Sequence, residues 1–253
     1  MFYAFILLSL LSFSAQAMEE PVVTLWAPYE VLLEPSINNS PLSKFIPSSC
    51  SPKKCQNNLI AWIKENTSCP DFVSHNSSVP PLMQKWLLNK TTCQEMKEIV
   101  QKKTWFFNPV YHVAGAAFDP QTTAEHLVTI KEVITLIATC QKRGAQTCIA
   151  SNWNTESFSA IKTKHSCLVE LFKNQYISGE LDSLTSDQKF YEKIKDTMGG
   201  GRHYYYIDTE EGQESLDAAH EAGVTPISVI TANNQEKAAD LKLKLIKHGL
   251  ISG

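Results

Sequence analysis

The second half of the chain alternates long helical patterns with short apolar runs. The runs that are typical of strands are Thr147–Ala150, Tyr176–Ser178, Tyr204–Ile207 and Pro226–Ile230. Neighbouring strands separated by helices pair in parallel, because a parallel connection needs a long crossover. A further β-branched run, Val22–Trp26, adds a buried strand near the beginning of the chain. The pattern predicts an α/β fold, with a Rossmann-like parallel sheet between two layers of helices.

Apolar residues at helical spacing mark the helices between these strands. Leu127, Ile130, Ile134 and Ile137 form one stripe, which Gly144 ends in the C-cap position. Further helices are expected around Phe158, from Ser186 through the stripe of Phe190, Ile194 and Met198, up to Ala222, and from Gln235 onward. Leu241–Leu245 also fits strand alternation, but the preceding alanines favour a helix. Gly199–Gly201 precedes a strand, so it predicts a helix stop and turn and not a phosphate loop.

A segment of different composition separates the first strand from the rest. Residues 40–118 are rich in Ser, Asn, Pro and Cys, and their apolar residues recur at helical spacing, as in Leu59, Trp62 and Ile63 and again in Met83, Trp86 and Leu87. We interpret this segment as a helical insert. The predicted core is then built from residues 18–39 and 119–253.

Four of the seven cysteines, Cys50, Cys55, Cys69 and Cys93, lie in this insert. Their clustering predicts one or two local disulfides, as expected in an oxidising compartment. Zinc is the alternative, but these spacings lack a CxxC pair and no histidine is suitably placed. We therefore predict no metal at these cysteines.

Residues 1–17 have the features of a cleavable signal peptide. Phe2–Ser14 is apolar apart from serines, and Ala15–Ala17 is the small-x-small pattern that signal peptidase cleaves. An uncleaved anchor is the alternative, although this segment is short for a membrane span. We expect a secreted or periplasmic protein with no membrane span in its mature chain. The net charge of -3 argues against nucleic acid as a partner.

Three passages resemble motifs of the haloacid dehalogenase (HAD) superfamily. They are Cys148–Trp153, Ile177–Glu180 with Asp187–Tyr191, and Tyr205–Thr209 with Ala218–Gly223. The first resembles the second motif of the family, an apolar strand that ends in Ser or Thr. The second and third resemble the surroundings of the third and fourth motifs. The resemblance spans Val22 to Ile230 and implies a HAD-like core in which the helical insert is the cap domain.

The chain departs from this family at the positions that carry its chemistry. Ala27 stands where the family has its nucleophilic aspartate, and Tyr29 stands at the general acid. Thr185 replaces the lysine that binds the phosphoryl group, and Thr209 replaces the second acid of the fourth motif. A methyl group cannot attack phosphorus, and no aspartate occurs between Met18 and Cys69. No catalytic residue can therefore be assigned.

Three polar residues of the family pattern remain, namely Ser151, Asn152 and Asp208. The resemblance implies that they could bind a phosphate or another ligand, whereas capping of local turns explains them equally well. Asp208 alone is a weak magnesium site, because Mg²⁺ usually needs several oxygen ligands. Glu30 as a substitute nucleophile, with Lys189 or Lys193 as a substitute cation, is an alternative, but solvated charges at a strand end and on a helix surface explain these residues more simply.

Two functions follow from these residues. In the first, the protein is a catalytically inactive HAD-like protein that needs no cofactor and binds a small ligand or a protein partner in the crevice between cap and core. In the second, it is a phosphatase-like or dehalogenase-like hydrolase with a rearranged site that uses Mg²⁺. The sequence names neither the ligand nor the partner.

Overall fold

The computed structural model describes residues 21–28, 31–35, 52–67, 69, 77–104 and 109–253. The predicted signal peptide, residues 1–17, lies outside this part of the chain, as do Tyr29 and Glu30. Among the described helices, none combines the length and the apolar character that a membrane crossing requires.

The described part of the chain contains a five-stranded parallel sheet, in the order β5-β4-β1-β6-β7. The strands are β1 (Val22–Trp26), β4 (Gln146–Ser151), β5 (Asn174–Ile177), β6 (His203–Thr209) and β7 (Thr225–Val229). β1 lies at the centre, because its residues are β-branched or bulky and Val23–Trp26 are fully buried. Each predicted strand is present.

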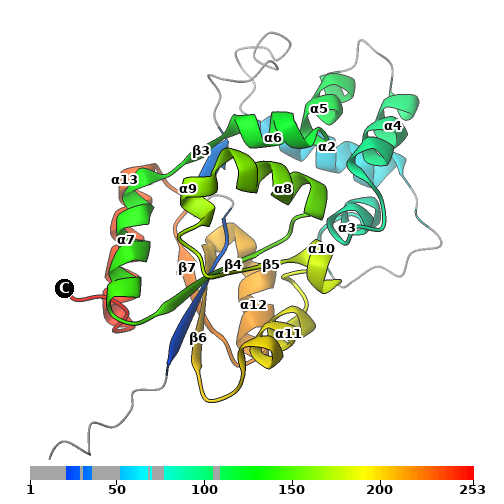
Figure 1. The fold of residues 1–253 in the computed structure, drawn as a ribbon. Coiled ribbons are helices and arrows are strands. Elements are labelled where there is room, and N and C mark those ends of the chain that lie inside the picture. The colour runs from blue at the N-terminus through cyan, green and yellow to red at the C-terminus, as the bar shows by residue number, and fades with distance from the viewer. Residues whose placement is uncertain (1–20, 29–30, 36–51, 68, 70–76, 105–108) are drawn as a thin grey trace, which may run out of the picture.

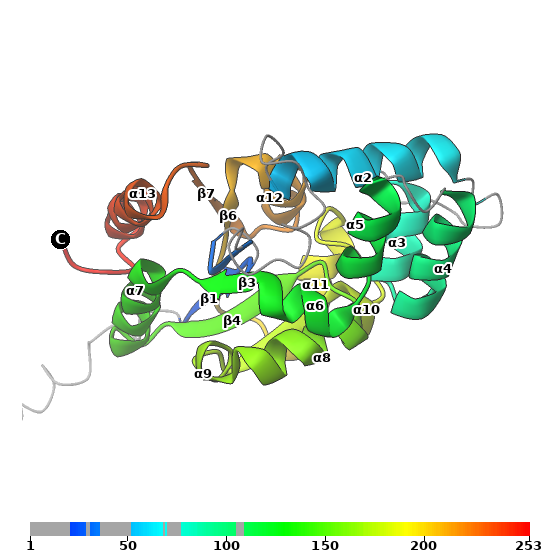
Figure 2. The same cartoon turned by 90° about the horizontal axis from the view of Figure 1, so that it is seen from above.

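Helices cover both faces of this sheet (Figures 1 and 2). α7 (Lys131–Lys142) and α13 (Asn234–Lys247) lie on one face, and α11 (Gln188–Met198) and α12 (Gln213–Glu221) lie on the other. α8 (Thr155–Lys164) and the short α9 (Ser166–Val169) follow β4, and α10 (Ser178–Leu181) follows β5. A 3-10 turn, η2 (Glu210–Gly212), joins β6 to α12. The predicted fold class, a three-layer α/β sheet with a helical insertion after the first strand, is confirmed.

The helical insert has a hydrophobic core of its own. Its helices are α2 (Pro52–Asn66), α3 (Pro81–Leu87), α4 (Cys93–Lys103) and α5 (Pro109–Ala117). Leu59 and Ile63 from α2 meet Trp86 from α3 and Met96 from α4 in one buried cluster, and Trp86 packs edge-on against Phe118. The helical stripes predicted in this segment thus form the core of a compact subdomain.

One prediction for the helices after the insert is wrong in part. Leu127 does not belong to the stripe of α7, because Leu127–Thr129 is a strand, β3. β3 pairs antiparallel with β2 (Leu33–Pro35), and α6 (Pro120–His126) precedes it. α7 begins at Lys131 and ends before Gly144, which adopts a φ of 88° as predicted for a C-cap glycine.

Two element boundaries also differ from those predicted. Ser178 is the first residue of α10 and not the last of a strand. α11 begins at Gln188 and not at Ser186, because the Asp187 carboxylate accepts hydrogen bonds from Leu184 N and Ser183 Oγ and so fixes the preceding turn. The final helix is confirmed, as is the turn at Gly199 and Gly201, which have φ of 86° and 72°.

The disulfide prediction is wrong for Cys69 and Cys93, which are free thiols. Cys93 lies at the buried first turn of α4, where its sulfur accepts hydrogen bonds from Trp86 Nε1 (3.3 Å) and Asn154 Nδ2 (3.2 Å). Burial raises the pKa of this thiol. Its packing therefore explains its position without a bridge. Cys50 and the side chain of Cys55 lie outside the described residues.

Candidate functional site

The carboxyl end of the central strand brings three predicted site residues together. Ala27 directly follows β1, and its amide donates to Ile207 O (2.9 Å). Trp26 pairs with Ile207 in β6 and Ile149 in β4, so the next residues, Ala27 and Asp208, lie side by side, and Ser151 lies at the end of the other neighbouring strand. This edge of the sheet is where α/β folds hold ligands.

Ala27 is buried, with 6% of its surface exposed. Its methyl group has no lone pair or proton to exchange, so it supplies neither a nucleophile nor a metal ligand. The residue two positions later, Tyr29, lies outside the described residues. The centre of the predicted site is therefore apolar at the position where the family resemblance would require a carboxylate.

Thr185 is part of a buried hydrogen-bond network and is only 2% exposed. The Asn152 side chain bonds it twice, since Asn152 Nδ2 donates to Thr185 Oγ1 (2.7 Å) and Asn152 Oδ1 accepts from Thr185 N (2.9 Å). Thr185 Oγ1 also shares a hydrogen bond with Ser215 Oγ (2.8 Å). We call Asn152, Thr185 and Ser215 the polar network. It joins β4, the loop before α11 and the first turn of α12 without any charge.

Asp208 contacts residues of its own strand and the turn that follows it. Its carboxylate accepts a hydrogen bond from Tyr206 OH (2.7 Å) and one from the backbone N–H of Thr209 (2.8 Å). It also packs tightly against Gly212, where an added Cβ would lie 2.4 Å from Asp208 Oδ2. These contacts fix the passage from β6 into η2.

The Tyr206 phenol shares this environment with Tyr191. Tyr206 and Tyr191 are fully buried, and their rings lie 5.1 Å apart. Burial raises the pKa of Tyr206 well above its ordinary value, and the charge of Asp208 raises it further. Burial and the same charge also raise the pKa of Tyr191, whose hydroxyl donates to Ser215 O (2.9 Å). Both phenols therefore stay protonated and act as hydrogen-bond donors.

Magnesium does not fit the described residues at this edge. Mg²⁺ needs near-octahedral oxygen ligands and loses water reluctantly. The described part of the chain contains no group of three His, Cys, Asp or Glu side chains that could hold a metal ion. Thr209, where the family resemblance would place a second acid, is uncharged and buried.

The substitute cations proposed from the sequence lie elsewhere. Lys193 Nζ donates to the backbone carbonyls of Leu181 and Asp182, which holds it over the end of α10. Lys189 is exposed on α11. The structure therefore does not bring either lysine into the polar network, and Glu30 lies outside the described residues.

Sequence reasoning missed three residues of this site: Ser215, Tyr206 and Ser186. The hydroxyl of Ser215 completes the polar network, and Tyr206 orients Asp208. The i, i+2 spacing of Tyr206 and Asp208 was the available signal, because it puts both side chains on one face of a strand. Ser186 Oγ is buried and has no hydrogen-bond partner in the described part of the chain.

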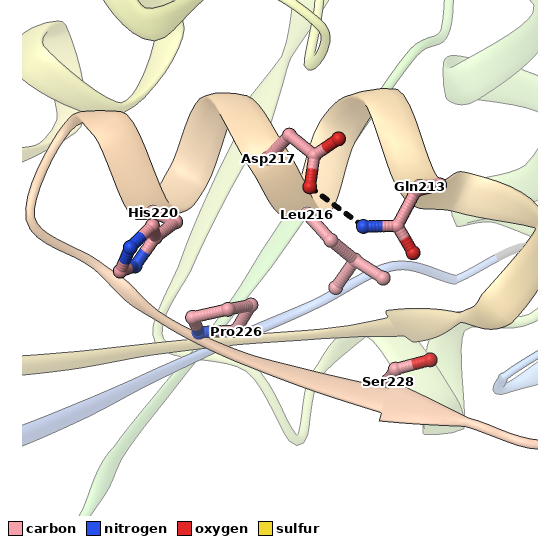
Figure 3. Close-up of a pocket in the computed structure, with 6 residues that line it drawn as sticks. All are labelled: Gln213, Leu216, Asp217, His220, Pro226 and Ser228. Atoms are coloured by element: carbon pink, nitrogen blue, oxygen red, sulfur yellow. Dashed lines mark hydrogen bonds between the residues drawn. The ribbon is translucent and has the colours of Figure 1, made fainter.

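A separate surface depression lies between α12 and β7 (Figure 3). Its volume is about 280 Å³. It is lined by Gln213, Leu216, Asp217, His220, Pro226 and Ser228. Gln213 Nε2 donates to Asp217 Oδ1 across one turn of α12 (2.6 Å). None of the site residues predicted from the sequence lines this depression.

Comparison with known proteins gives matches in structure only. No protein-family model matches the chain, and no curated protein matches it. A HAD family enzyme from Bacteroides thetaiotaomicron, solved as an aspartate-to-alanine mutant in complex with magnesium and inorganic phosphate, has a TM-score of 0.53 and 12% identity. That match covers 82% of this chain and 93% of the enzyme. A dehalogenase solved with an intermediate complex has a TM-score of 0.57 and 13% identity, with 84% of this chain and 86% of that chain covered. The chain therefore has the fold of haloacid dehalogenase family enzymes.

Proposed function

We propose that this chain is a HAD-fold protein without hydrolase activity, which binds a small ligand or a protein partner at the crevice between the helical insert and the core. The observation that carries the proposal is Ala27 at the carboxyl end of the central strand, beside Asp208. When catalytic residues act as a unit, removal of one of them abolishes most of the rate enhancement. Loss of the nucleophile alone lowers kcat about a millionfold in some hydrolases.

The polar network supports the same proposal. At the position where the family resemblance would place a lysine, Thr185 is buried and bonded to Asn152 and Ser215. A phosphoryl group carries negative charge and is normally held by cations or metal ions. The described network is uncharged and its members bond one another, so it supplies no charge that would stabilise a transferred phosphoryl group.

Ligand binding after the loss of an aspartate is seen in one structure of this fold. The Bacteroides enzyme was solved as an aspartate-to-alanine mutant with magnesium and inorganic phosphate bound. An enzyme of this fold thus keeps a ligand after an aspartate is exchanged for alanine. The Ser186 hydroxyl, next to Thr185, has no hydrogen-bond partner among the described residues, so a ligand or a water molecule would satisfy it.

A hydrolase of the phosphatase or dehalogenase type is the second candidate. The matched structures include a dehalogenase, and HAD family enzymes of this fold were solved with magnesium. Such an enzyme would use Ser151, Asp208 and Glu30 in a rearranged site with Mg²⁺. The lack of further ligands argues against it, since the described part of the chain contains no group of three His, Cys, Asp or Glu side chains that could hold a metal ion.

An assay of magnesium-dependent hydrolysis of an aryl phosphate separates the two candidates. We expect the parent protein and Asp208→Asn to release phenol at the same background rate. Asp217→Asn, which changes an exposed aspartate on α12, is the matched control. Turnover in the parent and the control that disappears in Asp208→Asn would establish the hydrolase. The variant Ala27→Asp, Tyr29→Asp, Thr185→Lys tests whether the family residues restore activity to this scaffold.

We also propose that the protein is secreted or periplasmic, with cleavage after Ala17. The support is the apolar segment Phe2–Ser14 and the small residues that follow it. Amino-terminal sequencing of the mature protein should begin at Met18. A mature chain that begins at Met1 would contradict this proposal.

A further inference from the structure

The helical insert meets the core at a compact set of hydrogen bonds centred on Asn89. Asn89 lies in the loop after α3, with a φ of 57°. Its side chain bonds the core twice, since Nδ2 donates to Gly179 O (2.8 Å) and Oδ1 accepts from Thr155 N (3.0 Å). One amide thus bridges the first turns of two core helices, α8 and α10.

The contact at Gly179 is as close as the backbone allows. A Cβ built on Gly179 would lie 2.7 Å from Asn89 Nδ2, and the three nearest atoms to it all belong to the Asn89 side chain. Gly179 does not have a positive φ, so its backbone conformation does not require glycine. The absence of a Cβ instead leaves room for the Asn89 side chain of the insert. The Asn89 side chain of the insert therefore lies directly against the backbone of α10 in the core.

Three further bonds join the two parts, and two of them are buried. Ser178 Oγ donates to Leu87 O (2.9 Å) at the end of α3, and Ser178 is fully buried. At the start of α4, Cys93 N donates to Glu156 Oε2 (3.0 Å), and Cys93 Sγ accepts from Asn154. A buried donor that loses its partner costs free energy, so separation of the two parts would have to hydrate these groups.

Apolar packing joins the two parts at the same place. Leu184 belongs to the core by sequence, but it is fully buried within the hydrophobic cluster of the insert. The loop before α11 therefore contributes a side chain to the hydrophobic core of the insert. We call Leu184, Ser178, Gly179 and Asn89 the joint.

A second contact lies on another helix of the core. The Glu214 carboxylate, in the first turn of α12, accepts from Ser77 Oγ (3.0 Å) and from Ser78 N (3.0 Å). Ser77 and Ser78 precede α3 in the insert. The insert therefore contacts the core both before α3, through Ser77 and Ser78, and after α3, through Asn89. A hinge motion about one contact would break the other.

We propose that the insert and the core form one permanent body, fixed by the joint, and that the insert does not open and close as a lid. This inference does not depend on whether the crevice binds a ligand. It implies that a ligand enters the crevice without any movement of the insert relative to the core.

A double-mutant cycle of thermal unfolding tests the joint. Asn89→Gly removes the side chain and keeps the left-handed φ, while Gly179→Ala introduces the Cβ that would clash with Asn89. We expect Gly179→Ala to lower Tm in the parent, because Asn89 must move and lose its bonds to Gly179 and Thr155, and to lower it much less in the Asn89→Gly background, where the side chain is absent. Equal losses of Tm in the two backgrounds would show that Asn89 is not seated on Gly179 and would overturn the proposal.

Distances between spin labels test the motion directly. The labels are attached at Lys102 on α4 and Lys142 on α7, both exposed, through an encoded keto amino acid that avoids the seven native cysteines. We expect one narrow distance distribution in the parent, and a broad one in the variant Asn89→Gly, Leu184→Ala. Lys90→Ala is the control, because it removes only the exposed ion pair with Asp182 and should leave the distribution narrow. Two populations in the parent, or a narrow distribution in the joint variant, would overturn the proposal.

Discussion

Substitution of Thr185 by valine should destabilise the protein strongly. The two side chains have nearly the same shape, so the change removes the hydroxyl and leaves the packing. Asn152 Nδ2 then loses its acceptor and Ser215 Oγ loses its partner. The backbone bond from Thr185 N to Asn152 Oδ1 remains.

The magnitude follows from the burial of these groups. A buried polar group left without a partner costs about 1–3 kcal/mol, so the two groups together should cost about 2–4 kcal/mol, reduced where Ser215 rotates to a new partner. For a chain of this size, about 1 kcal/mol corresponds to about 2–4 °C in Tm, and Thr185→Val should lower Tm by roughly 5–15 °C.

Urea unfolding followed by circular dichroism measures this loss, with Thr185→Ser as the matched control. Serine keeps the hydroxyl and should retain most of the stability. If Thr185→Val lies within about 0.5 kcal/mol of the parent, a difference typical of surface changes, then the polar network does not stabilise the carboxyl edge of the sheet and our reasoning is refuted.

Three smaller changes test other parts of the account. Tyr206→Phe removes the hydrogen bond to Asp208 and should cost about 1–3 kcal/mol in urea unfolding, whereas no loss would show that this bond does not hold the carboxylate. Ser186→Ala should leave Tm unchanged or raise it, because its hydroxyl has no partner in the described part of the chain, and a clear loss would reveal one. Burial raises the pKa of Cys140 and Cys148 from 9.0 to about 11, so the folded chain holds more protons than the unfolded chain between these values. Stability should therefore fall as the pH rises from 9 to 11, by up to about 1.4 kcal/mol per pH unit for each thiol, and Cys148→Ala should flatten this slope in melting curves.

The strands of the sheet could be predicted because each is a short apolar run that is recognisable in the local sequence. Val22–Trp26 is a β-branched run that must be buried on both faces, and it became the central strand. The order of the motifs then placed Ser151 and Asp208 at the same edge as Ala27. Parallel strands separated by helices leave little freedom in where their carboxyl ends meet.

The short β2–β3 pair could not be predicted in the same way. Leu127 and Ile130 match the spacing of the following helix, and only pairing with Leu33–Pro35 makes Leu127–Thr129 a strand. That pairing joins segments separated by the whole helical insert. A local pattern carries no information about such a partner.

The cysteines of the insert show a similar limit. Their clustering predicted disulfides, but the structure uses Cys93 as a buried residue whose sulfur accepts bonds from Trp86 and Asn154. A buried thiol and a bridged cysteine look alike in one sequence. The polar network was also hidden, since Ser215 has no motif and becomes part of the site only through the fold.

Titration of the parent with inorganic phosphate in the presence of millimolar Mg²⁺ tests the central claim most directly. Because the polar network carries no charge and the described residues offer no group of metal ligands, calorimetry should record no saturable heat in the parent or in Asp208→Asn. Magnesium-dependent phosphate binding by the parent that vanishes in Asp208→Asn would contradict the claim.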